Sequence, residues 1–320
     1  MRKSWATVIK EAILEAGREH IRNKTDYNLP IDIFSIIESN NIVLMFQPLG
    51  ALAGAYLPGE KKRGTPAGIL INENLPITKQ RYSAAHEYCH FLRKDSGSLD
   101  TQVDMFDLTK YKNDDAERIA ESFASRFLMP RPLITNMMKK LGIDSKELNA
   151  VNVYALSLRL GTSYSATVNQ LYSLKFITDQ KKRQLTIPPK TIKEQLGNNG
   201  LETNWNDIWQ VVKNDHGNYL SPKQGDILKI HLEENPASGY TWISSYNQGL
   251  DVIEDKWHPY NGVGSGGQKH LTIKLTQPGL TNFELRYSRP WRRDEIIDSL
   301  KVNLQIESKR HGVNEALLTG

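Results

Sequence analysis

The sequence of 320 residues has a single cysteine, Cys89, and no long apolar run. One cysteine excludes an intrachain disulfide and a cysteine-rich zinc module, and this count is typical of the reducing cytoplasm. No run approaches the ~20 apolar residues that span a bilayer, so no membrane partner is expected. The first residues carry charge or polarity every few positions, unlike a secretory signal. These absences predict a cytoplasmic protein.

Low-complexity composition is also absent. Hydrophobic residues make up 39% and charged residues 24% of the chain, with 22 glycines and 14 prolines. This composition predicts a folded globular chain and disfavours disorder or a collagen-like repeat. The length exceeds what one ordinary core organises, so about two domains are expected. The net charge of +5 is too small and too spread out to predict direct nucleic-acid binding.

Hydrophobic periodicity divides the chain into two parts of different character. The first part alternates helical patterns with a few short strands, which is typical of an α+β domain. Its expected helices are 4–23, 31–40, 81–93 and 114–128, and its expected strands are 42–46 and 68–72. The stretch 180–204 is rich in lysine, proline and glycine and predicts a boundary. From residue 205 onward, short alternating strands predict an antiparallel β-sandwich.

The sharpest local motif is His86-Glu87-Tyr88-Cys89-His90, an H-E-x-x-H arrangement within a helical pattern. On a helix, residues four apart lie about 40° apart around the axis, so both imidazoles can reach one metal ion. Glu87 then lies on the flank of the metal, where a general base must be. The alternative is a helix with two surface histidines, but chance rarely produces this spacing. Cys89 lies on the opposite flank from Glu87, which favours a core-packing thiol.

A hydrolytic zinc site needs three protein ligands and an open fourth position, so another ligand must come from elsewhere. The expected helix 114–128 offers Glu117 and Glu121, four residues apart on one face. We predict Glu117 as the ligand and Glu121 as the acceptor that orients a histidine N–H. The two roles reversed, or a solvated acidic face, are the alternatives that the spacing leaves open.

Two stretches together resemble the ImmA/IrrE family of metallopeptidases. They are Gln80-Arg-Tyr-Ser-Ala-Ala-His-Glu-Tyr-Cys-His-Phe-Leu92 and Glu117-Arg-Ile-Ala-Glu-Ser-Phe-Ala-Ser-Arg-Phe-Leu-Met-Pro130, within a resemblance covering about 8–178. In that family a glutamate lies three residues before the Ala of an Ala-x-x-Phe-Ala core, which selects Glu117 as the ligand. The family often has Asn at the position of Glu121, so that residue is a departure.

The resemblance implies a zincin-like, zinc-dependent endopeptidase that cleaves a helix-turn-helix repressor and thereby induces stress, mobile-element or defence genes. Zinc held by His86, His90 and Glu117 would acidify water, and Glu87 would pass the proton to the leaving amine. Manganese is the alternative metal for this ligand set. The strand 68–72 is expected to pair with an extended substrate. The segment 151–174 has a helix-turn-helix pattern but no Arg or Lys from Thr162 to Leu174, so structural packing is favoured over DNA binding.

Three loop sequences stand out on the expected sandwich: Glu234-Asn-Pro-Ala-Ser-Gly-Tyr-Thr-Trp242, Gly262-Val-Gly-Ser-Gly-Gly267 and Arg289-Pro-Trp291. They resemble the loops of the chagasin family of cysteine-peptidase inhibitors, and the resemblance covers about 205–308. The departures are Ala237-Ser238 in place of a threonine pair and Arg292 in place of a common acidic residue. The resemblance implies an immunoglobulin-like fold and loops that bind a papain-like peptidase or another protein. The candidate binding residues are Asn235, Pro236, Gly239, Tyr240 and Trp242 in the first loop, Gly264, Gly266 and Gly267 in the second, and Arg289, Pro290 and Trp291 in the third.

These inferences predict a metallopeptidase core joined to a protein-recognition or regulatory sandwich. The expected segments are a core at 1–130, a helical extension at 131–178, a linker at 179–204, the sandwich at 205–309 and a tail at 310–320. The alternative function is an inhibitor or binding module for papain-like peptidases on a degenerate peptidase scaffold.

Overall fold

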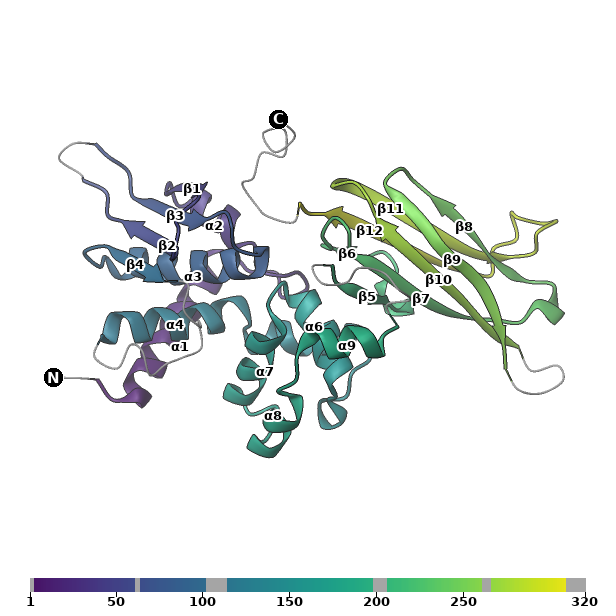
Figure 1. Ribbon diagram of the computed structural model, residues 1–320, viewed down its shortest axis with the longest axis horizontal. Helices are drawn as coiled ribbons and strands as arrows, with labels where there is room; N and C mark the ends of the chain where they lie inside the picture. The colour runs from purple at the N-terminus through teal and green to yellow at the C-terminus, as the bar shows by residue number, and fades with distance from the viewer. Residues whose placement is uncertain (1–2, 61–63, 102–113, 198–205, 261–265, 309–320) are drawn as a thin grey trace. The chain divides into compact units, whose positions relative to one another are not determined.

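The computed structural model describes residues 3–60, 64–101, 114–197, 206–260 and 266–308 (Figure 1). The chain forms two compact units, one with residues 1–137 and 160–186 and the other with residues 138–159 and 187–308. None of the described helices is both long enough and apolar enough to cross a membrane. The expected tail at 310–320 lies outside the described residues.

A four-stranded sheet lies in the N-terminal unit, with the order β1-β3-β2-β4 (Figure 1). Its strands are β1 (Val43–Gln47), β2 (Leu52–Leu57), β3 (Gly68–Asn72) and β4 (Ser98–Thr101). β3 pairs in parallel with β1 and antiparallel with β2, while β4 pairs antiparallel with β2. The expectation that β3 pairs with a substrate is therefore wrong, because both edges of β3 are already paired.

Strand β2 was not predicted from the sequence because its central residues, Ala-Gly-Ala, have low β-propensity. The structure gives a reason for the glycine. A Cβ at Gly54 would lie 2.5 Å from Ser83 Oγ on the helix that packs on the sheet. The small residue that hides the strand from sequence analysis therefore allows the close approach of that helix.

Four helices complete the part of this unit that positions the metal motif. They are α1 (Trp5–Arg22), α2 (Ile33–Ser39), α3 (Ile77–Arg93) and α4 (Asp115–Leu128). α3 packs on β2 and β3 on one side and on α4 on the other, and α4 also packs on α1. α3 begins four residues earlier than expected because Pro76 starts it, and it ends at Lys94 in the left-handed region with φ 58°. Its motif residues are consequently buried between two layers.

The remaining helices are shared between the two units. They are α5 (Arg131–Lys140), α6 (Ala150–Leu160), α7 (Tyr164–Ser173), α8 (Asp179–Leu185) and α9 (Pro189–Gln195). α7 and α8 belong to the N-terminal unit, whereas α9 and almost all of α6 belong to the C-terminal unit. The segment expected to be a linker thus contains α8 and α9.

Two four-stranded sheets form the C-terminal unit, with the orders β5-β7-β10-β9 and β6-β12-β11-β8. The strands are β5 (Ile208–Val211), β6 (Tyr219–Leu220), β7 (Ile227–Glu234), β8 (Thr241–Tyr246), β9 (Leu250–Pro259), β10 (Gly267–Leu275), β11 (Gly279–Ser288) and β12 (Asp298–Ile306). The prediction of purely antiparallel pairing is wrong at two places. β5 pairs in parallel with β7, and β6 with β12, because the chain visits the second sheet between β5 and β7.

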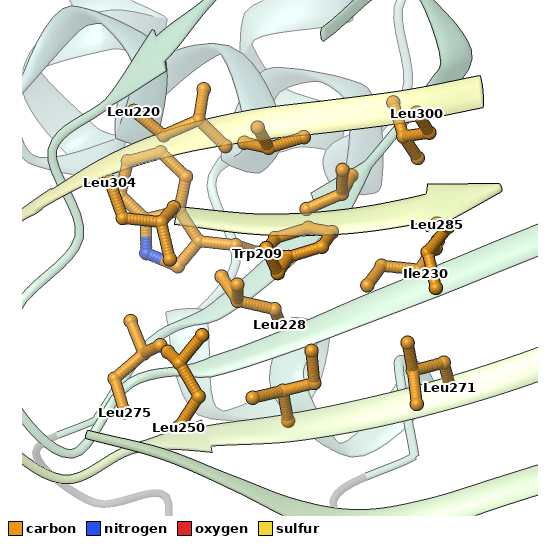
Figure 2. Close-up of a cluster of buried hydrophobic side chains, with 14 of the residues drawn as sticks. Trp209, Leu220, Leu228, Ile230, Leu250, Leu271, Leu275, Leu285, Leu300 and Leu304 are labelled. Atoms are coloured by element: carbon orange, nitrogen blue, oxygen red, sulfur yellow. The ribbon is translucent and has the colours of Figure 1, made fainter. Parts of the chain in front are cut away.

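The core of this unit lies between the inner faces of the two sheets (Figure 2). In β7, buried and more exposed residues alternate, which directs Leu228, Ile230 and Leu232 inward. Trp209 lies within the cluster and donates its indole N–H to Asp226 Oδ2 at 2.8 Å. The indole is therefore buried with its polar atom satisfied.

Candidate metal centre and loop cluster

Helix α3 brings the two predicted histidines together. His86 and His90 are each 1% exposed, and their Nε2 atoms lie 3.2 Å apart. This is the arrangement expected for residues one helical turn apart that direct the same nitrogen to the same side. The two rings are therefore placed by a helix that is itself fixed between the sheet and α4.

Helix α4 adds the predicted glutamate. Glu117 Oε2 lies 3.1 Å from His86 Nε2, and its Oε1 lies 3.4 Å from His90 Nε2. Glu117 is in the first turn of α4, where the side chain of Asp114 accepts hydrogen bonds from the Ala116 and Glu117 backbone N–H groups. Among the described residues, these are the three side chains whose ligand atoms all lie within 4.8 Å of one another.

The spacing of the nitrogen and oxygen ligand atoms suits a small tetrahedral metal ion. Zinc binds histidine nitrogen at about 2.0–2.1 Å, which in tetrahedral geometry places neighbouring ligand atoms about 3.3 Å apart. The two Nε2 atoms lie 3.2 Å apart, and each lies 3.1–3.4 Å from one oxygen of the Glu117 carboxylate, Oε2 for His86 and Oε1 for His90. Two imidazoles and one carboxylate are also the donor types that zinc accepts in sites with a remaining open position. The ligand set of such a zinc site is therefore matched, in both number and spacing, by His86, His90 and Glu117.

The charges of the cluster support one another. Burial raises the pKa of Glu117, but the hydrogen bonds and charges of both histidines outweigh it and lower the pKa to about 2. Burial lowers the pKa of His90, but its contacts with Glu117 and Asp95 outweigh this effect and the net shift is upward. Glu117 is therefore held as a carboxylate, the form that binds a cation.

Acidic side chains contact the second nitrogen of each histidine. Glu121 Oε2 lies 3.6 Å from His86 Nδ1, and its Oε1 accepts a hydrogen bond of 2.8 Å from Tyr82. Asp95 Oδ2 accepts from His90 Nδ1 at 2.8 Å. The Asp95 hydrogen bond fixes the orientation of the His90 ring and leaves its Nε2 for the metal, while Glu121 lies close enough to His86 for a longer electrostatic contact. Glu121 thus lies where the sequence analysis placed it, beside a histidine.

The sequence analysis did not identify Asp95, which follows the end of the expected helix 81–93. The left-handed conformation of Lys94 ends α3, and the Asp95 N–H donates back to the His90 carbonyl at 3.0 Å. This turn returns the Asp95 side chain to the helix end. An acidic residue one turn after the second histidine, at a helix end, is the signal that could have identified it.

Glu87 is fully buried, next to His86 on the side of α3 that faces β2. A Cβ at Gly54 would lie 3.2 Å from Glu87 Cγ. The glutamate stem therefore packs against the backbone of β2, which restricts its rotation. This location on the flank of the histidine pair is the one expected for a general base.

Cys89 lies outside the group of converging ligand atoms. Its side chain is fully buried, and burial raises the pKa of its thiol well above the usual range. A thiol with a raised pKa is a poor nucleophile and a poor metal ligand at neutral pH. The expectation of a packing role for Cys89 agrees with this environment.

In the sandwich, the first and third predicted loops meet at one end. Gly239 has φ +79°, and a Cβ there would lie 3.1 Å from the ring of Trp291. The Arg289 guanidinium lies 4.7 Å from the centre of the Tyr240 ring. Trp291 itself is 70% exposed, which is unusual for the largest apolar side chain. The two loops therefore support an exposed indole.

The base of the second loop reaches the same end. A Cβ at Gly266 would lie 3.4 Å from Asn235 Cβ, so the glycine allows the first and second loops to touch. Gly267 is the first residue of β10, where it pairs with Pro259 of β9. Gly264 lies outside the described residues.

Trp242 differs from its predicted role in a binding loop. It lies in β8 and is only 4% exposed, and its indole N–H donates to the Glu233 carbonyl at 2.8 Å. Its ring stacks on Tyr287 at 4.9 Å. Trp242 therefore supports the loop from the core and is not available to a partner. The prediction was wrong because a strand begins at Thr241, inside the stretch read as a loop.

Comparisons with known proteins assign both parts of the chain. The IrrE N-terminal-like domain matches residues 37–172, and the Chagasin family peptidase inhibitor I42 matches residues 221–306. The Radiation response metalloprotease IrrE of Deinococcus deserti is 32% identical over 113 residues, which cover 34% of this chain and 37% of that protein. The match thus spans little more than a third of that relative.

The relatives that match the C-terminal part of this chain are aligned with it over most of their own length. Amoebiasin-2 of Entamoeba histolytica is 33% identical over 100 residues, or 29% of this chain and 80% of that protein. Chagasin of Trypanosoma cruzi is 29% identical over 90 residues, or 26% and 82% respectively. A solved cysteine protease inhibitor from Entamoeba histolytica has 25% identity, covers 32% of this chain and 96% of its own, and has a TM-score of 0.29. The chain therefore belongs to the chagasin family of peptidase inhibitors through its C-terminal domain and also carries an IrrE N-terminal-like domain.

Proposed function

We propose that the N-terminal unit is a zinc-dependent, site-specific endopeptidase. The observation that carries this proposal is the convergence of His86, His90 and Glu117 at separations that suit tetrahedral zinc. The buried Glu87 on the flank of the pair adds the base that hydrolysis needs. The similarity to a metalloprotease over 113 residues supports the same reaction class.

The residues of the chain would divide the work as follows. When bound, zinc supplies Lewis acidity that polarises a carbonyl and makes water more acidic. Glu87 takes the proton from the attacking water and delivers it to the leaving amine. Asp95 and Glu121 hold the two imidazoles in their orientations. The full burial of the histidine pair keeps these electrostatic interactions in a medium of low dielectric constant, where they are strongest.

For substrate positioning we propose β4 in place of β3. Among the described strands, β4 pairs only with β2 and ends the sheet, so its outer backbone groups can pair with an extended peptide. β4 directly follows the turn at Lys94 and Asp95 that closes the histidine helix. An added peptide strand would therefore run beside the metal ligands.

We propose a helix-turn-helix repressor as the substrate and the sandwich as a recognition or regulatory module. The name of the Deinococcus deserti relative, a radiation response metalloprotease, supports a role in a stress response. The test is co-expression with a candidate helix-turn-helix repressor, chosen by searching the genes adjacent to this one. A defined cleavage product with the wild-type chain, absent with an inactive variant, is expected; an intact repressor would reject this substrate.

The catalytic proposal is tested by Glu87→Gln, which removes the base but none of the three proposed ligands. The variant should bind as many zinc ions as the wild type does and lose at least 100-fold in cleavage rate, since general-base catalysis contributes about 10²–10⁴-fold. The matched control is Glu38→Gln, which makes the same substitution, with the same loss of one negative charge, at an exposed residue of α2. Cleavage at the wild-type rate by pure Glu87→Gln protein would refute the assignment.

A second function, inhibition of a papain-like cysteine peptidase, is favoured by the exposed Trp291 between two touching loops. Trp291→Ala should weaken inhibition of a papain-like peptidase at least 10-fold, since a truncated aromatic anchor costs ~2 kcal/mol or more. Leu280→Ala, at a residue 78% exposed on β11, is the control for loss of an exposed apolar side chain. Absence of inhibition across a panel of such enzymes would remove this function. Glu87→Gln should leave inhibition unchanged, which separates the two activities.

A further inference from the structure

Three histidines form a row across neighbouring strands of the C-terminal unit, far in sequence from the H-E-x-x-H motif. His231 is on β7, His270 on β10 and His258 on β9, and these strands are adjacent in one sheet (Figure 1). His231 and His270 are directly opposite in the antiparallel ladder. Their ring centres lie 4.1 Å apart, and those of His258 and His270 lie 4.2 Å apart. We call these residues the histidine row.

The row lies on the outer face of the sheet. The neighbours of His231 and His270 along their strands, such as Ile230 and Leu271, point into the core. Since side chains alternate along a strand, the three imidazoles face away from the core. His231 and His258 are exposed and His270 is half-buried. The row is therefore open to a ligand from solution.

We propose that the histidine row binds a divalent transition-metal ion of the kind that prefers imidazole, such as Zn²⁺, Ni²⁺ or Cu²⁺. Directly opposite residues have Cβ atoms about 4.5–5.5 Å apart, a spacing from which two imidazoles can reach one ion. His258 supplies a third ring from the next strand. Three imidazoles match the nitrogen-rich donor sets of zinc and copper sites.

The electrostatic surroundings keep the rings ready for a metal. Burial and the neighbouring histidines lower the pKa of His231 and of His270, so their nitrogens keep free lone pairs at neutral pH. Two acidic groups share the face of the row: Glu254 on β9 accepts a 3.4 Å hydrogen bond from Thr272, and Glu233 on β7 accepts one of 3.0 Å from Gln268. Two cations share this face: the Lys229 ammonium donates to the Leu196 carbonyl at 2.8 Å, and Lys256, the cross-strand partner of His270, lies 3.6 Å from Glu254.

The rings must rotate to close around an ion. In the structure they are stacked, and among the described residues only the His86, His90 and Glu117 group has three converging ligand atoms. Rotation about the side-chain bonds is open to the exposed rings, because stacking of imidazoles at a surface is weak compared with coordination. Gln268 Oε1 accepts from His270 Nε2 at 3.4 Å, which leaves Nδ1 of that ring for the metal.

A bound ion would join β9 to β10 close to the second inhibitor-like loop. His258 immediately precedes Pro259, and Pro259 pairs with Gly267 in the last described rung before that loop. Coordination by His258 and His270 would fix this end of the hairpin. Metal binding at the row would therefore reduce the conformational freedom of the loop base.

The test is zinc titration by calorimetry of the full-length, metal-free chain, with His270→Gln compared with the wild type. We expect the wild type to bind one more equivalent of Zn²⁺ than His270→Gln, and His258→Gln to weaken that equivalent at least 10-fold. His216→Gln, at an exposed histidine outside the row, should bind as the wild type does. Equal stoichiometry and affinity in wild type, His270→Gln and His258→Gln would overturn the proposal. The wild type and the row variants all keep His86, His90 and Glu117, so any failure of that site would affect them equally. The difference in zinc stoichiometry between them therefore reports on the histidine row alone.

Retention of the untagged chain on immobilised Ni²⁺ gives an independent readout. His86 and His90 are 1% exposed and cannot reach ions held on a matrix, so retention reports on surface histidines. The wild type and His216→Gln should elute at similar imidazole concentrations, and His258→Gln and His270→Gln clearly earlier. Circular dichroism establishes that each variant is folded. Co-elution of all four folded proteins would likewise overturn the proposal.

Discussion

Replacement of Asp95 tests whether its hydrogen bond holds the His90 ring in the orientation that metal binding needs. Asp95 accepts a 2.8 Å hydrogen bond from Nδ1 of His90, whose other nitrogen lies 3.2 Å from His86 Nε2. In Asp95→Ala, Nδ1 loses this acceptor, and the ring is free to change its tautomer or rotate. The Nε2 lone pair is then no longer fixed in the direction of the proposed ion. We expect weaker zinc binding without loss of the fold.

The magnitude follows from the burial of the ring. His90 is almost completely buried, so water replaces the lost acceptor poorly. Removal of such an outer partner of a metal ligand typically costs about 10–100-fold in affinity, or ~1.4–2.7 kcal/mol. Asp95→Asn keeps an acceptor oxygen but loses the charge, so its affinity should fall between those of the wild type and Asp95→Ala.

The assay is competition for Zn²⁺ against a chromogenic chelator, with purified full-length proteins. Asp251→Ala, which removes an exposed carboxylate on β9, is the matched control and should bind as the wild type does. Thermal unfolding in chelator establishes that the variants are folded before metal is added. An Asp95→Ala affinity within about twofold of the wild type would refute the orienting role, because the expected loss is at least 10-fold.

Three further predictions concern packing, a buried ion pair and pH. Gly54→Ala should lower stability by about 1–3 kcal/mol, because its Cβ would lie 2.5 Å from a helix side-chain oxygen. Arg159→Met should cost about 3–5 kcal/mol, because it leaves Asp215, 2.8 Å away, buried without its cation. The lowered pKa values in the histidine row mean that the unfolded chain binds more protons below pH 6.5, so acidification should destabilise the wild type more than His270→Gln.

All three predictions are tested by chemical or thermal unfolding, which gives the stability of each variant relative to the wild type. Gly17→Ala on α1, where a Cβ meets nothing within 4 Å, is the control for Gly54→Ala and should stabilise by about 0.5–1 kcal/mol. Unchanged stability of Gly54→Ala would mean that β2 and α3 are less tightly packed than the structure indicates. A loss under about 1 kcal/mol for Arg159→Met would contradict a buried pair. Parallel stability curves from about pH 7 to 5 for wild type and His270→Gln would contradict the pH prediction.

Sequence analysis predicted the elements that have strong periodicity or motif spacing. The helix that carries His86 and His90 and the helix that carries Glu117 both form, and their three ligand atoms converge. This was predictable because H-E-x-x-H spacing and helical geometry fix the relative positions of the histidines. The contact of Glu117 with that pair rested on the family resemblance, since spacing alone did not distinguish it from Glu121.

The features that escaped prediction depend on tertiary packing. β2 was not predicted because it has small residues where a helix lies against it. β5 and β6 pair in parallel with β7 and β12, strands that do not directly follow them in the chain, and no local pattern encodes such pairings. Asp95 reaches His90 only because the chain reverses at Lys94. In each case the missing information is the position of a neighbouring element.

The two units alternate along the chain, because almost all of α6 belongs to the C-terminal unit whereas α7 and α8, which follow it, belong to the N-terminal unit. The polypeptide leaves the first unit after residue 137, returns at 160 and leaves again after 186. Tyr154 donates to Asp207 at 2.9 Å, and Arg159 is paired with Asp215. A truncation after residue 178 would therefore expose the buried Tyr154 and leave the Arg159 cation without a partner. No single cut separates the two units along the chain, so each unit depends on the other for the continuity of its polypeptide.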